Sequence, residues 1–548
     1  MFWRLLSLLG GLSFGLALRA NPALDPALVP PGTTKLRFEV TAVPGLLGAP
    51  AEGRLIVVLG RTNAPEPRTR VGDISLRAEP VLGTDVTAFD GRRPAVLGQG
   101  SALFPQRSLT ELPAGDYWLQ AVLATNRDFR LLDAPGNLVS QPVLARLDPQ
   151  RRAAVKLTLD HRLPDEPPAG TDSVKFVTLR SEKLSQFWGR PMFLRAGVIL
   201  PKGWAEEPSR RYPLVIRIGG FGTRYTWVSG AMAEGSNFRR DWLAETTPRF
   251  VLLQLDGAGP LGDPYQIDSA NHGPWGAALT EELLPYVEAA WRCVGQPHAR
   301  FTTGGSTGGW VSLALQVLYP DFFGGCWSGY PDPADFRALQ LVDIYADPNA
   351  FVNAAGLERP CAREVNGETR FTMRQETQLE NVLGLHDSYA FSGGQWGSWN
   401  ATYGPRTAAG RPALIWDART GALDRDVANA WRRYDLRDHL AKHWTEVGPK
   451  LRGKIHLWMG DADTYFLDTA ARHLDDFLKS AEPPADARLE FGPRQPHGWE
   501  PRTWAELLKE MQAAVDARAP KSAAANHDYL KARFGHSAGT CPVCKGGR

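Results

Sequence analysis

Short runs of alternating apolar and polar residues fill the first part of the chain. They are rich in β-branched and aromatic residues and are separated by clusters of Gly and Pro. This pattern predicts an all-β domain over residues 33–165, of the immunoglobulin-like sandwich type, with a structural or substrate-orienting role. The predicted strands cover residues 35–43, 54–59, 116–123 and 153–159.

The pattern changes after a Pro-rich segment, residues 164–170, which is typical of a linker. From residue 173 to residue 518, apolar strands alternate with segments of helical periodicity. Parallel strands need such helical crossovers, so the alternation predicts an α/β fold with a doubly wound sheet. The predicted strands cover 212–219, 250–255, 323–328, 454–459 and 489–491, with another beginning at Phe301, and the clearest helices cover 281–291, 465–478 and 504–515.

One long segment, about residues 331–452, interrupts the alternation and is rich in Trp, Gly and polar residues. It is far longer than an ordinary loop. It leaves the sheet at the carboxyl edge, where ligands bind in open α/β sheets. We therefore expect a large cap-like insertion over a functional site; an added structural subdomain is the alternative.

Candidate chemistry begins with Gly304-x-Ser306-x-Gly308, where the strand starting at Phe301 meets an apolar-periodic segment that stops at Pro320. A very tight strand-to-helix turn forces its central residue into strained geometry, for which small neighbours leave room. The turn would lift the Ser306 hydroxyl to a helix N-terminus, where backbone N–H groups stabilise negative charge. An ordinary Gly-rich turn is the alternative, and the rest of the sequence decides between them.

A serine hydroxyl needs a base, usually His, and a carboxylate that orients the base. Both follow Ser306 in the order typical of sheet hydrolases, each just beyond a predicted strand. Asp463 follows the strand 454–459, and His497 follows the strand 489–491. Asp461, two residues nearer the strand end, is the alternative acid.

The same reaction needs two N–H donors directed at a developing oxyanion. The amide of Thr307 is one candidate because it directly follows Ser306. The second is expected from the glycine-rich loop 219–222, where Phe221 is the first choice and Gly220 the next. A tight turn with no such role is the alternative for that loop.

The first twenty residues predict an export signal, with Arg4, an apolar run over 5–18 and a cleavage point at Ala20. The run is short and interrupted by glycines, so we expect no stable membrane insertion after cleavage; an uncleaved anchor is the alternative. The protein is therefore expected to be exported, either periplasmic or secreted. A net charge of +3 without a long basic run argues against a nucleic-acid partner.

The five cysteines are too few, and odd in number, for a disulfide-built scaffold. Cys541 and Cys544 fall in a C-terminal tail, residues 519–548. A local disulfide or free thiols there are favoured over half of a zinc site. No metal and no organic cofactor are expected.

Residues from about 173 to 515 resemble the α/β-hydrolase fold, and within it the putative-esterase group that includes enterochelin-esterase-like and esterase-D-like proteins. The resemblance implies Ser306 as nucleophile, His497 as base and an Asp after the penultimate strand as acid. Two features depart from the group: the oxyanion loop lacks the usual His before its glycines, and compact members have no counterpart of the large insertion. The stretches that carry the resemblance are 212–216, 304–310, 319–323 and 497–499.

The leading hypothesis is an exported serine hydrolase that cleaves a small-molecule or carbohydrate-linked carboxylic ester through an acyl-enzyme on Ser306. A serine peptidase of the same fold is an alternative, because the same triad cleaves amides. A non-catalytic ligand-binding protein on a hydrolase scaffold is another alternative. The many tryptophans of the insertion would suit stacking on sugars or aromatic groups, or plain core packing.

Overall fold

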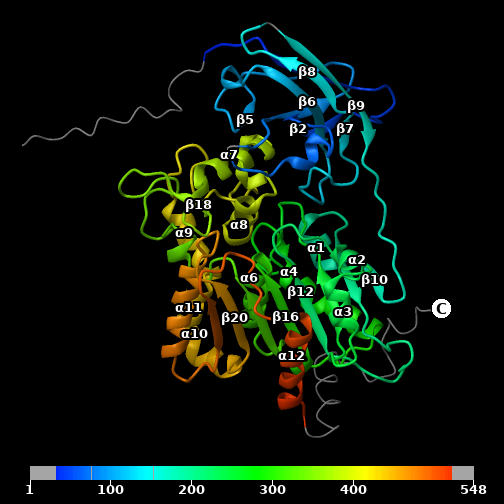
Figure 1. The fold of residues 1–548 in the computed structure, drawn as a ribbon, viewed down its shortest axis with the longest axis vertical. Helices are drawn as coiled ribbons and strands as arrows, with labels where there is room; N and C mark the ends of the chain where they lie inside the picture. The colour runs from blue at the N-terminus through cyan, green and yellow to red at the C-terminus, as the bar shows by residue number, and fades with distance from the viewer. Residues whose placement is uncertain (1–31, 76, 152, 521–548) are drawn as a thin grey trace, which may run out of the picture.

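The computed structural model describes residues 32–75, 77–151 and 153–520. A β-rich domain lies at one end of the molecule and an α/β domain at the other, with a helical insertion between them on one side (Figure 1). The predicted export signal, residues 1–20, lies outside the described residues. So do Cys541 and Cys544, whereas Cys293, Cys326 and Cys361 are buried free thiols.

The β-rich domain consists of nine strands over residues 37–162, which we call the β-domain. Hydrogen bonds join all nine into one sheet, in the order β4-β1-β9-β7-β6-β2-β3-β5, with β8 paired to β6. The predicted immunoglobulin-like arrangement of two packed sheets is not confirmed. The strands are β1 Arg37–Ala42, β2 Ala51–Gly60, β3 Val81–Phe89, β4 Ala95–Leu97, β5 Ala102–Phe104, β6 Gly115–Ala124, β7 Leu138–Ser140, β8 Val143–Leu147 and β9 Ala154–Arg162.

The second domain is built on an eight-stranded sheet in the order β10-β11-β13-β12-β16-β17-β20-β21. The six strands from β13 to β21 pair in parallel, and β10 and β11 add an antiparallel edge. The predicted α/β-hydrolase sheet is thus present. Its strands are β10 Val174–Arg180, β11 Phe193–Ile199, β12 Leu214–Ile218, β13 Val251–Leu255, β16 Arg300–Gly305, β17 Gly325–Gly329, β20 Ile455–Gly460 and β21 Arg488–Gly492.

Helices cover both faces of this sheet, and a separate apolar core fills each interface. One face buries apolar residues of α2, α3 and α12; the other buries those of α4, α5, α6, α10 and α11. The helices are α1 Glu182–Trp188, α2 Trp227–Ala231, α3 Asn237–Leu243, α4 Trp275–Ala278, α5 Leu284–Ala290, α6 Thr307–Leu318, α10 Leu436–Leu451, α11 Asp468–Ser480 and α12 Trp504–Arg518. A two-strand hairpin, β14 Asp268–Ser269 and β15 Gly273–Pro274, precedes α4.

The insertion is smaller than the predicted 331–452. Helix α10 buries Leu436, Leu440, Trp444 and Leu451 against the core of the sheet, so it is the crossover helix that leads into β20. The insertion proper holds the hairpin β18 Pro360–Arg363 and β19 Thr369–Thr372, with helices α7 Met373–Leu383, α8 Gln395–Tyr403 and α9 Arg425–Trp431.

The tryptophans of the insertion belong to its core. Trp396, Trp399, Trp416 and Trp431 are all buried, in the same apolar cluster as helix α6 of the sheet domain. These four rings follow the core-packing alternative, and Trp399 also lines a cavity that is described below. Their burial makes the insertion continuous with the α/β domain instead of a separate flap.

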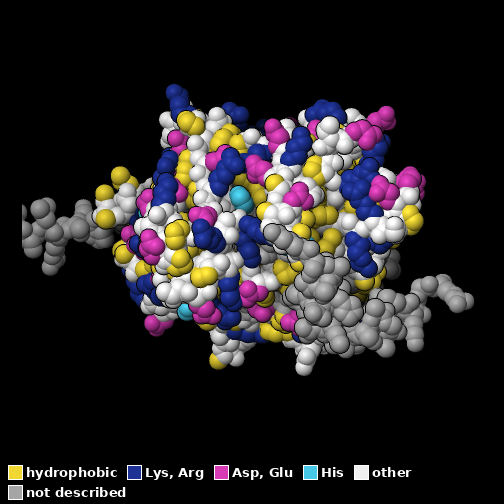
Figure 2. All heavy atoms as spheres, turned by 90° about the horizontal axis from the view of Figure 1, so that it is seen from below, with side chains coloured by type: hydrophobic (Ala, Val, Ile, Leu, Met, Phe, Trp, Pro, Cys, Tyr) yellow, Lys and Arg dark blue, Asp and Glu magenta, His cyan; other side chains and the backbone are white. Residues whose placement is uncertain are grey.

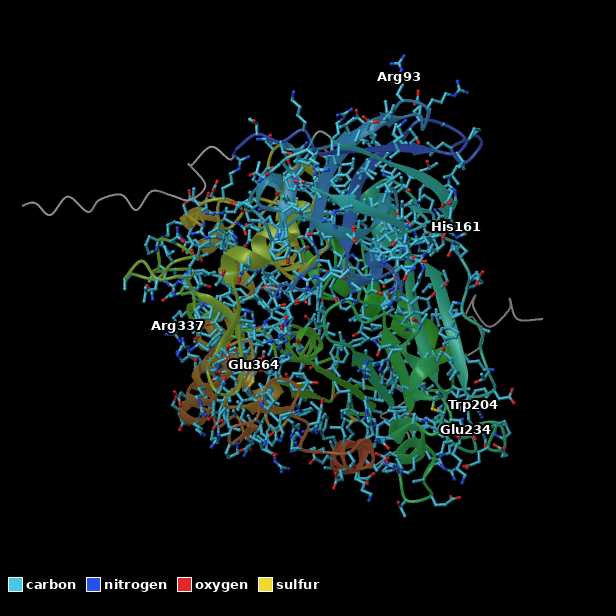
Figure 3. The ribbon with its side chains drawn as sticks, turned by 45° about the horizontal axis from the view of Figure 1, so that its top comes forward. Arg93, His161, Trp204, Glu234, Arg337 and Glu364 are labelled. Atoms are coloured by element: carbon cyan, nitrogen blue, oxygen red, sulfur yellow. The ribbon has the colours of Figure 1, made fainter. Side chains whose placement is uncertain are left out.

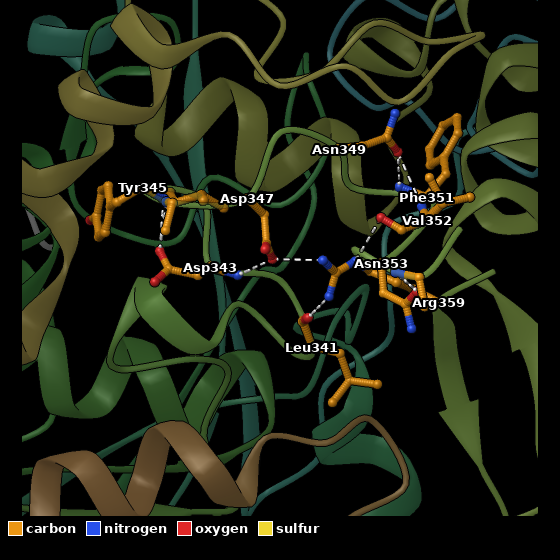
Figure 4. A network of polar contacts seen from close by, with 12 residues as sticks. Leu341, Asp343, Tyr345, Asp347, Asn349, Phe351, Val352, Asn353 and Arg359 are labelled. Carbon is orange, nitrogen blue, oxygen red and sulfur yellow. Dashed lines mark hydrogen bonds and ion pairs between the residues drawn. The ribbon is translucent and has the colours of Figure 1, made fainter. Parts of the chain in front are cut away.

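A polar network fixes the first loop of the insertion (Figure 4). The Arg359 guanidinium donates to Asp347 Oδ2 at 2.7 Å and to the carbonyl of Val352 at 3.3 Å. Asp347 also accepts the backbone N–H of Asp343 at 3.0 Å. Because Arg359 lies next to β18, these bonds tie the loop to the hairpin.

Strand β2 explains why the β-domain sits on the insertion. Its side chains alternate between faces, and both faces are buried. Leu55, Val57 and Leu59 enter the core of the β-domain, whereas Ile56 and Val58 enter a second apolar cluster that includes side chains of α7. The insertion therefore covers the second face of the β-domain sheet.

Arg54, also on β2, adds a polar tie across this interface. Its side chain is 1% exposed and donates to Asp85 at 2.9 Å, to the Val382 carbonyl at 2.8 Å and to Asp387 at 2.7 Å. Gly83 of β3 makes room for it, because a Cβ there would lie 2.7 Å from an Arg54 nitrogen and 2.2 Å from the Val382 oxygen.

Side chains of the β-domain that point away from the insertion lie at the margin of the molecule. Figure 3 shows Arg93 and His161 on this outer side, and Arg337 and Glu364 on the side of the insertion. Figure 2 shows both signs of charge interspersed over the face seen from below. Among the described residues, no helix combines the length and apolar character that a membrane span needs.

We expect Arg54→Ala to destabilise the protein by about 3 kcal/mol, because it removes a buried charge and leaves its partners at the interface unsatisfied. Urea unfolding measures this loss. Arg146→Ala is the control: it breaks an exposed pair with Asp116, at 3.5 Å, and should cost less than about 1 kcal/mol. Equal losses in the two variants would show that Arg54 does not tie the domains together.

Candidate active site

Ser306 sits at the junction between β16 and α6, at the carboxyl edge of the sheet. Its backbone angles are φ 60° and ψ −125°, which a residue with a side chain rarely adopts. Such strain persists only where the surroundings hold it. One restraint is its N–H, which donates to the Gly329 carbonyl at the end of β17 at 3.1 Å.

The two flanking glycines allow this geometry. A Cβ at Gly304 would lie 2.2 Å from the Ile218 oxygen, and a Cβ at Gly308 would lie 2.1 Å from the same oxygen. The end of β12 therefore touches the backbone on both sides of Ser306. Only glycine fits at these positions.

His497 and Asp463 lie together at the neighbouring strand ends, after β21 and β20. The two side chains share a hydrogen bond of 2.7 Å between His497 Nδ1 and Asp463 Oδ2. Asp463 is 0% exposed, and its other oxygen accepts the N–H groups of Tyr465 at 2.8 Å and Leu467 at 3.3 Å. The carboxylate is thus held in one orientation, with one oxygen left for the imidazole.

The imidazole of His497 is enclosed by two tyrosine rings. Tyr330 and Tyr465 meet it edge-on, with centroids 4.8 Å and 5.0 Å away, and its side chain is 14% exposed. Since Nδ1 is bonded to Asp463, Nε2 is the nitrogen left for a proton transfer. His497 and Ser306 line the same cavity, of about 1100 Å³. Within the described part of the chain they share no hydrogen bond, and such bonds often tighten only when substrate is bound.

Asp461, the alternative acid, faces elsewhere. Its carboxylate accepts the backbone N–H of Arg494, and its own N–H donates to the Gly492 carbonyl at 3.0 Å. It therefore holds the loop that follows β21. Of the two candidate acids, Asp463 is the one that contacts His497.

The predicted oxyanion donors lie on either side of Ser306, at the point where the strand order reverses. β12 pairs with β13 on one side and β16 on the other, so the loops that follow β12 and β16 diverge there and leave a crevice. A Cβ on Gly220 would lie 3.7 Å from that of Ser306. Phe221 is 38% exposed and lines the cavity. Thr307 is the first residue of α6, where helix amides lack intrahelical partners.

Asp332 is a site residue that the sequence analysis missed. Its buried carboxylate accepts hydrogen bonds from Tyr265 at 2.6 Å, Thr307 Oγ1 at 3.0 Å and Trp399 at 3.1 Å, and its N–H donates to the Ser306 carbonyl at 3.3 Å. Burial raises the pKa of this carboxyl group, and the hydrogen bonds oppose the rise. The network fixes the turn that carries Ser306. The position of Asp332 just after β17 was a usable signal in the sequence, but the residues that bind Asp332 come from distant segments.

Three parts of the chain form the walls of the cavity. The sheet domain provides Ser306 and His497, and the insertion contributes residues such as Gln395 and Trp399. The β-domain contributes residues of two loops, 68–77 and 130–133. The insertion thus flanks the site, in line with the expected cap, and the β-domain lines it as well.

Two acids of α7, Glu376 and Glu380, also line the cavity. Glu380 is 4% exposed, and accepts the N–H groups of Trp396 at 2.8 Å and Gly397 at 2.9 Å, at the start of α8. Burial, and then the charge of Glu376, raises the pKa of Glu380 to about 8; burial raises that of Glu376 to about 7. Among the described residues, no cluster of His, Cys, Asp or Glu is arranged to hold a metal ion.

Part of the chain matches the model of a known protein family. Residues 189–515 match the family described as "Esterase: Putative esterase". The chain belongs to this family. It is a serine ester hydrolase of α/β-hydrolase fold, and the match covers the sheet domain from β11 onward with its insertion, but not the β-domain. None of the curated proteins compared with the chain matches it.

Several solved structures are similar to this part of the chain. A ferulic acid esterase is 14% identical over 63% of this chain and 98% of its own, with a TM-score of 0.39. An S-formylglutathione hydrolase from Agrobacterium tumefaciens is 13% identical over 63% and 94%, with a TM-score of 0.33. MPT51 from Mycobacterium tuberculosis is 14% identical over 63% and 99%, with a TM-score of 0.36.

We expect Asp463→Asn to lower kcat for p-nitrophenyl acetate by about ten-thousandfold, because Asn favours the wrong tautomer of the His497 ring. Asp461→Asn is the matched control and should stay within about tenfold of the wild type, since Asp461 faces away from His497. Steady-state kinetics of the two variants measure the difference. Similar losses of kcat in both variants would show that Asp463 is not the acid that orients His497.

We expect Glu380 to make stability depend on pH. The folded protein keeps the Glu380 proton up to a pH of about 8, whereas the unfolded chain releases it near the ordinary pKa of 4.5. The stability that this proton contributes is complete below pH 4.5 and is lost as the pH rises to about 8. Glu380→Gln keeps an acceptor oxygen but removes the titration, so its Tm should fall less than that of the wild type between pH 5 and pH 8.

Thermal unfolding at a series of pH values measures this effect. The exposed Glu368→Gln variant, from the same insertion, should keep the wild-type dependence. If Glu380→Gln keeps it too, the Glu380 carboxyl is already ionised in the folded protein.

Proposed function

We propose that the protein hydrolyses carboxylic esters through an acyl-enzyme on Ser306, with His497 as general base and Asp463 as the group that orients it. The observation that carries the proposal is the 2.7 Å bond between His497 and a fully buried, otherwise saturated carboxylate. His497 of this pair lines the same cavity as Ser306, which is held in a strained turn. If His497 and Asp463 only stabilised the fold, the protein would not need a serine in a strained turn in the same cavity.

Each proton has a place in this mechanism. Nε2 of His497 takes the Ser306 proton as Oγ attacks the ester carbonyl, and Asp463 stabilises the imidazolium that forms. The imidazolium then donates the proton to the departing alkoxide, which leaves as an alcohol. Water, deprotonated by the same nitrogen, attacks the acyl-enzyme, and the imidazolium returns this proton to Ser306 Oγ as the acid leaves. No cofactor takes part in this sequence.

The amides of Thr307 and Phe221 are the proposed donors to the oxyanion, with Gly220 as the alternative to Phe221. Thr307 begins a helix whose N-terminus favours negative charge. The loop after β12 approaches Ser306 closely at Gly220. One such donor typically contributes about a hundredfold to the rate or more.

The cavity suggests a substrate larger than a simple acetate ester. Its volume of about 1100 Å³ is slightly above the range of ordinary ligand sites, and three parts of the chain line it. A small-molecule or carbohydrate-linked ester is the substrate class that we propose. Export to the periplasm or the medium is proposed from Arg4 and the apolar run over 5–18.

Labelling with a fluorophosphonate, followed by mass spectrometry, tests the nucleophile. The expected adduct lies on the peptide that contains Ser306, and Ser306→Ala should lose both the label and at least about a thousandfold in kcat. Ser229→Ala, at an exposed position of helix α2, is the control and should keep both. A label on another residue, or equal activity in all three proteins, would overturn the proposal.

Assays with peptide anilides and with aryl esters test whether the enzyme prefers to cleave esters or amides. The wild type should cleave the esters much faster. A higher kcat/KM for the anilides would favour a peptidase.

A further inference from the structure

One loop of the β-domain, residues 125–137 between β6 and β7, reaches the α/β domain. The N–H of Arg130 donates to the Gly259 carbonyl at 3.3 Å. A Cβ on Gly393 of the insertion would lie 2.3 Å from the Cβ of Arg130 and 2.6 Å from its carbonyl oxygen. Arg130 is therefore placed where the three walls of the cavity meet.

The loop that carries Arg130 is fixed by its own side chains. Asn126 Oδ1 accepts the N–H groups of Asp128 at 2.7 Å and Phe129 at 2.8 Å. Asn137 donates to the carbonyl of Leu131 at 2.9 Å, on the other side of Arg130. With the backbone tied on both sides, the position of the Arg130 backbone is set before any ligand binds.

Arg195 and Arg224 of the α/β domain clamp the same loop. Their guanidinium groups lie 4.7 Å and 4.6 Å from the centre of the Phe129 ring, which is buried next to Arg130. Cation–π contacts of this kind are strongest where water is excluded. The loop thus docks firmly on the catalytic domain.

Arg130 lines the cavity, and the charge of Asp85 acts on its guanidinium without forming an ion pair with it. Its Nε is buried and makes no hydrogen bond, and among the described residues the guanidinium has no ion pair or hydrogen-bond acceptor. Of the other arginines that line the cavity, Arg68 pairs with Glu66 at 2.7 Å and Arg370 with Glu364 at 3.3 Å. Arg77 is exposed to solvent, so its charge is not desolvated as that of Arg130 is. A guanidinium offers five donors and is costly to desolvate unpaired, so an unpaired one in the same cavity as Ser306 favours an anion there.

Three carboxylates near Arg130 or in the cavity wall do not replace such an anion. Asp85 is bonded to Arg54, Asp332 accepts bonds from Tyr265 and Thr307, and Glu380 caps the start of α8. Burial keeps much of Glu380 protonated at neutral pH, since its pKa is about 8. An anionic ligand group would therefore meet little repulsion from Glu380.

We infer that Arg130 is a substrate-recognition residue, and that the preferred ester carries a carboxylate or a similar oxyanion on its acyl or its alcohol part. The guanidinium would bind this group through two parallel N–H···O bonds while the ester bond lies at Ser306. The inference rests on the proposed function of Ser306. It gives the β-domain a direct part in specificity.

Matched pairs of esters test this inference. On the acyl side, mono-4-nitrophenyl adipate is compared with 4-nitrophenyl hexanoate; on the alcohol side, 4-acetoxybenzoate is compared with 4-acetoxybenzamide. After correction for uncatalysed hydrolysis, kcat/KM of the wild type should favour the anionic member of one pair by tenfold to a hundredfold. The pair that shows the preference tells which part of the substrate reaches Arg130.

Variants then assign the preference to one side chain. Arg130→Met should abolish it, mainly by raising KM for the anionic ester, and leave the neutral ester within about twofold. Arg127→Met removes the same charge from an exposed position of the same loop and should keep the preference. Equal changes in the two variants would overturn the inference, because they would indicate general electrostatic attraction.

A binding measurement separates this inference from the proposed function. The probe is adipate if the acyl-side pair shows the preference, and 4-hydroxybenzoate if the alcohol-side pair shows it. This probe should raise the Tm of the wild type but not that of Arg130→Met. Its neutral analogue should raise the Tm of neither protein. If Arg130→Met does not fold, Arg130→Lys, which keeps the charge without the paired donors, replaces it and should lose at least half of the Tm shift.

If the wild type hydrolyses the neutral esters but shows no anion preference and no Tm shift, the inference fails and the proposed function stands. If no ester is hydrolysed at all, the proposed function fails.

Discussion

The contact between the end of β12 and the turn around Ser306 is the constraint on which the site depends. The Ile218 carbonyl oxygen lies so close to Gly304 and Gly308 that no side chain fits at either position. This packing of strand against turn forces Ser306 into its strained conformation and brings the loop that contains Gly220 next to it. The nucleophile and its proposed oxyanion donors thus follow from one backbone contact.

The remaining parts of the molecule converge on that turn. Asp463 and His497 come from the ends of β20 and β21, two and three strands away from β16, and Asp332 joins the turn to the insertion through Trp399. The insertion in turn covers the second face of β2, which places the β-domain against the cavity. Arg54 and Arg130 are consequences of the same docking: one ties the interface together and the other faces the cavity.

The sequence was most informative where local chemistry decides the structure. The strands of the α/β domain and the turn with Ser306 follow from hydrophobic periodicity and from glycine spacing, and Asp463 and His497 were found by their places after strands. The apolar run at 55–59 was also a signal, since a strand with both faces apolar needs a partner on each. That signal did not say that the second partner would be α7.

Other features depend on contacts between distant segments, which no local pattern encodes. The predicted insertion was too long because the helical spacing of the buried residues of α10 was not recognised as that of a crossover helix. Asp332 and Arg130 are single polar residues whose surroundings come from three parts of the chain. The sandwich prediction rested on strand patterns, which do not determine whether the strands join in one sheet or two.

A crystal structure of the protein with a phosphonate bound covalently would show whether the three side chains act together at Ser306. We expect phosphorus on Ser306 Oγ, with the phosphonyl oxygen within hydrogen-bond distance of the Thr307 and Phe221 amides and His497 Nε2 close to the leaving-group side. An adduct on another residue would contradict this expectation. So would a phosphonyl oxygen that contacts neither amide, or an imidazole too far from Ser306 to exchange a proton with it.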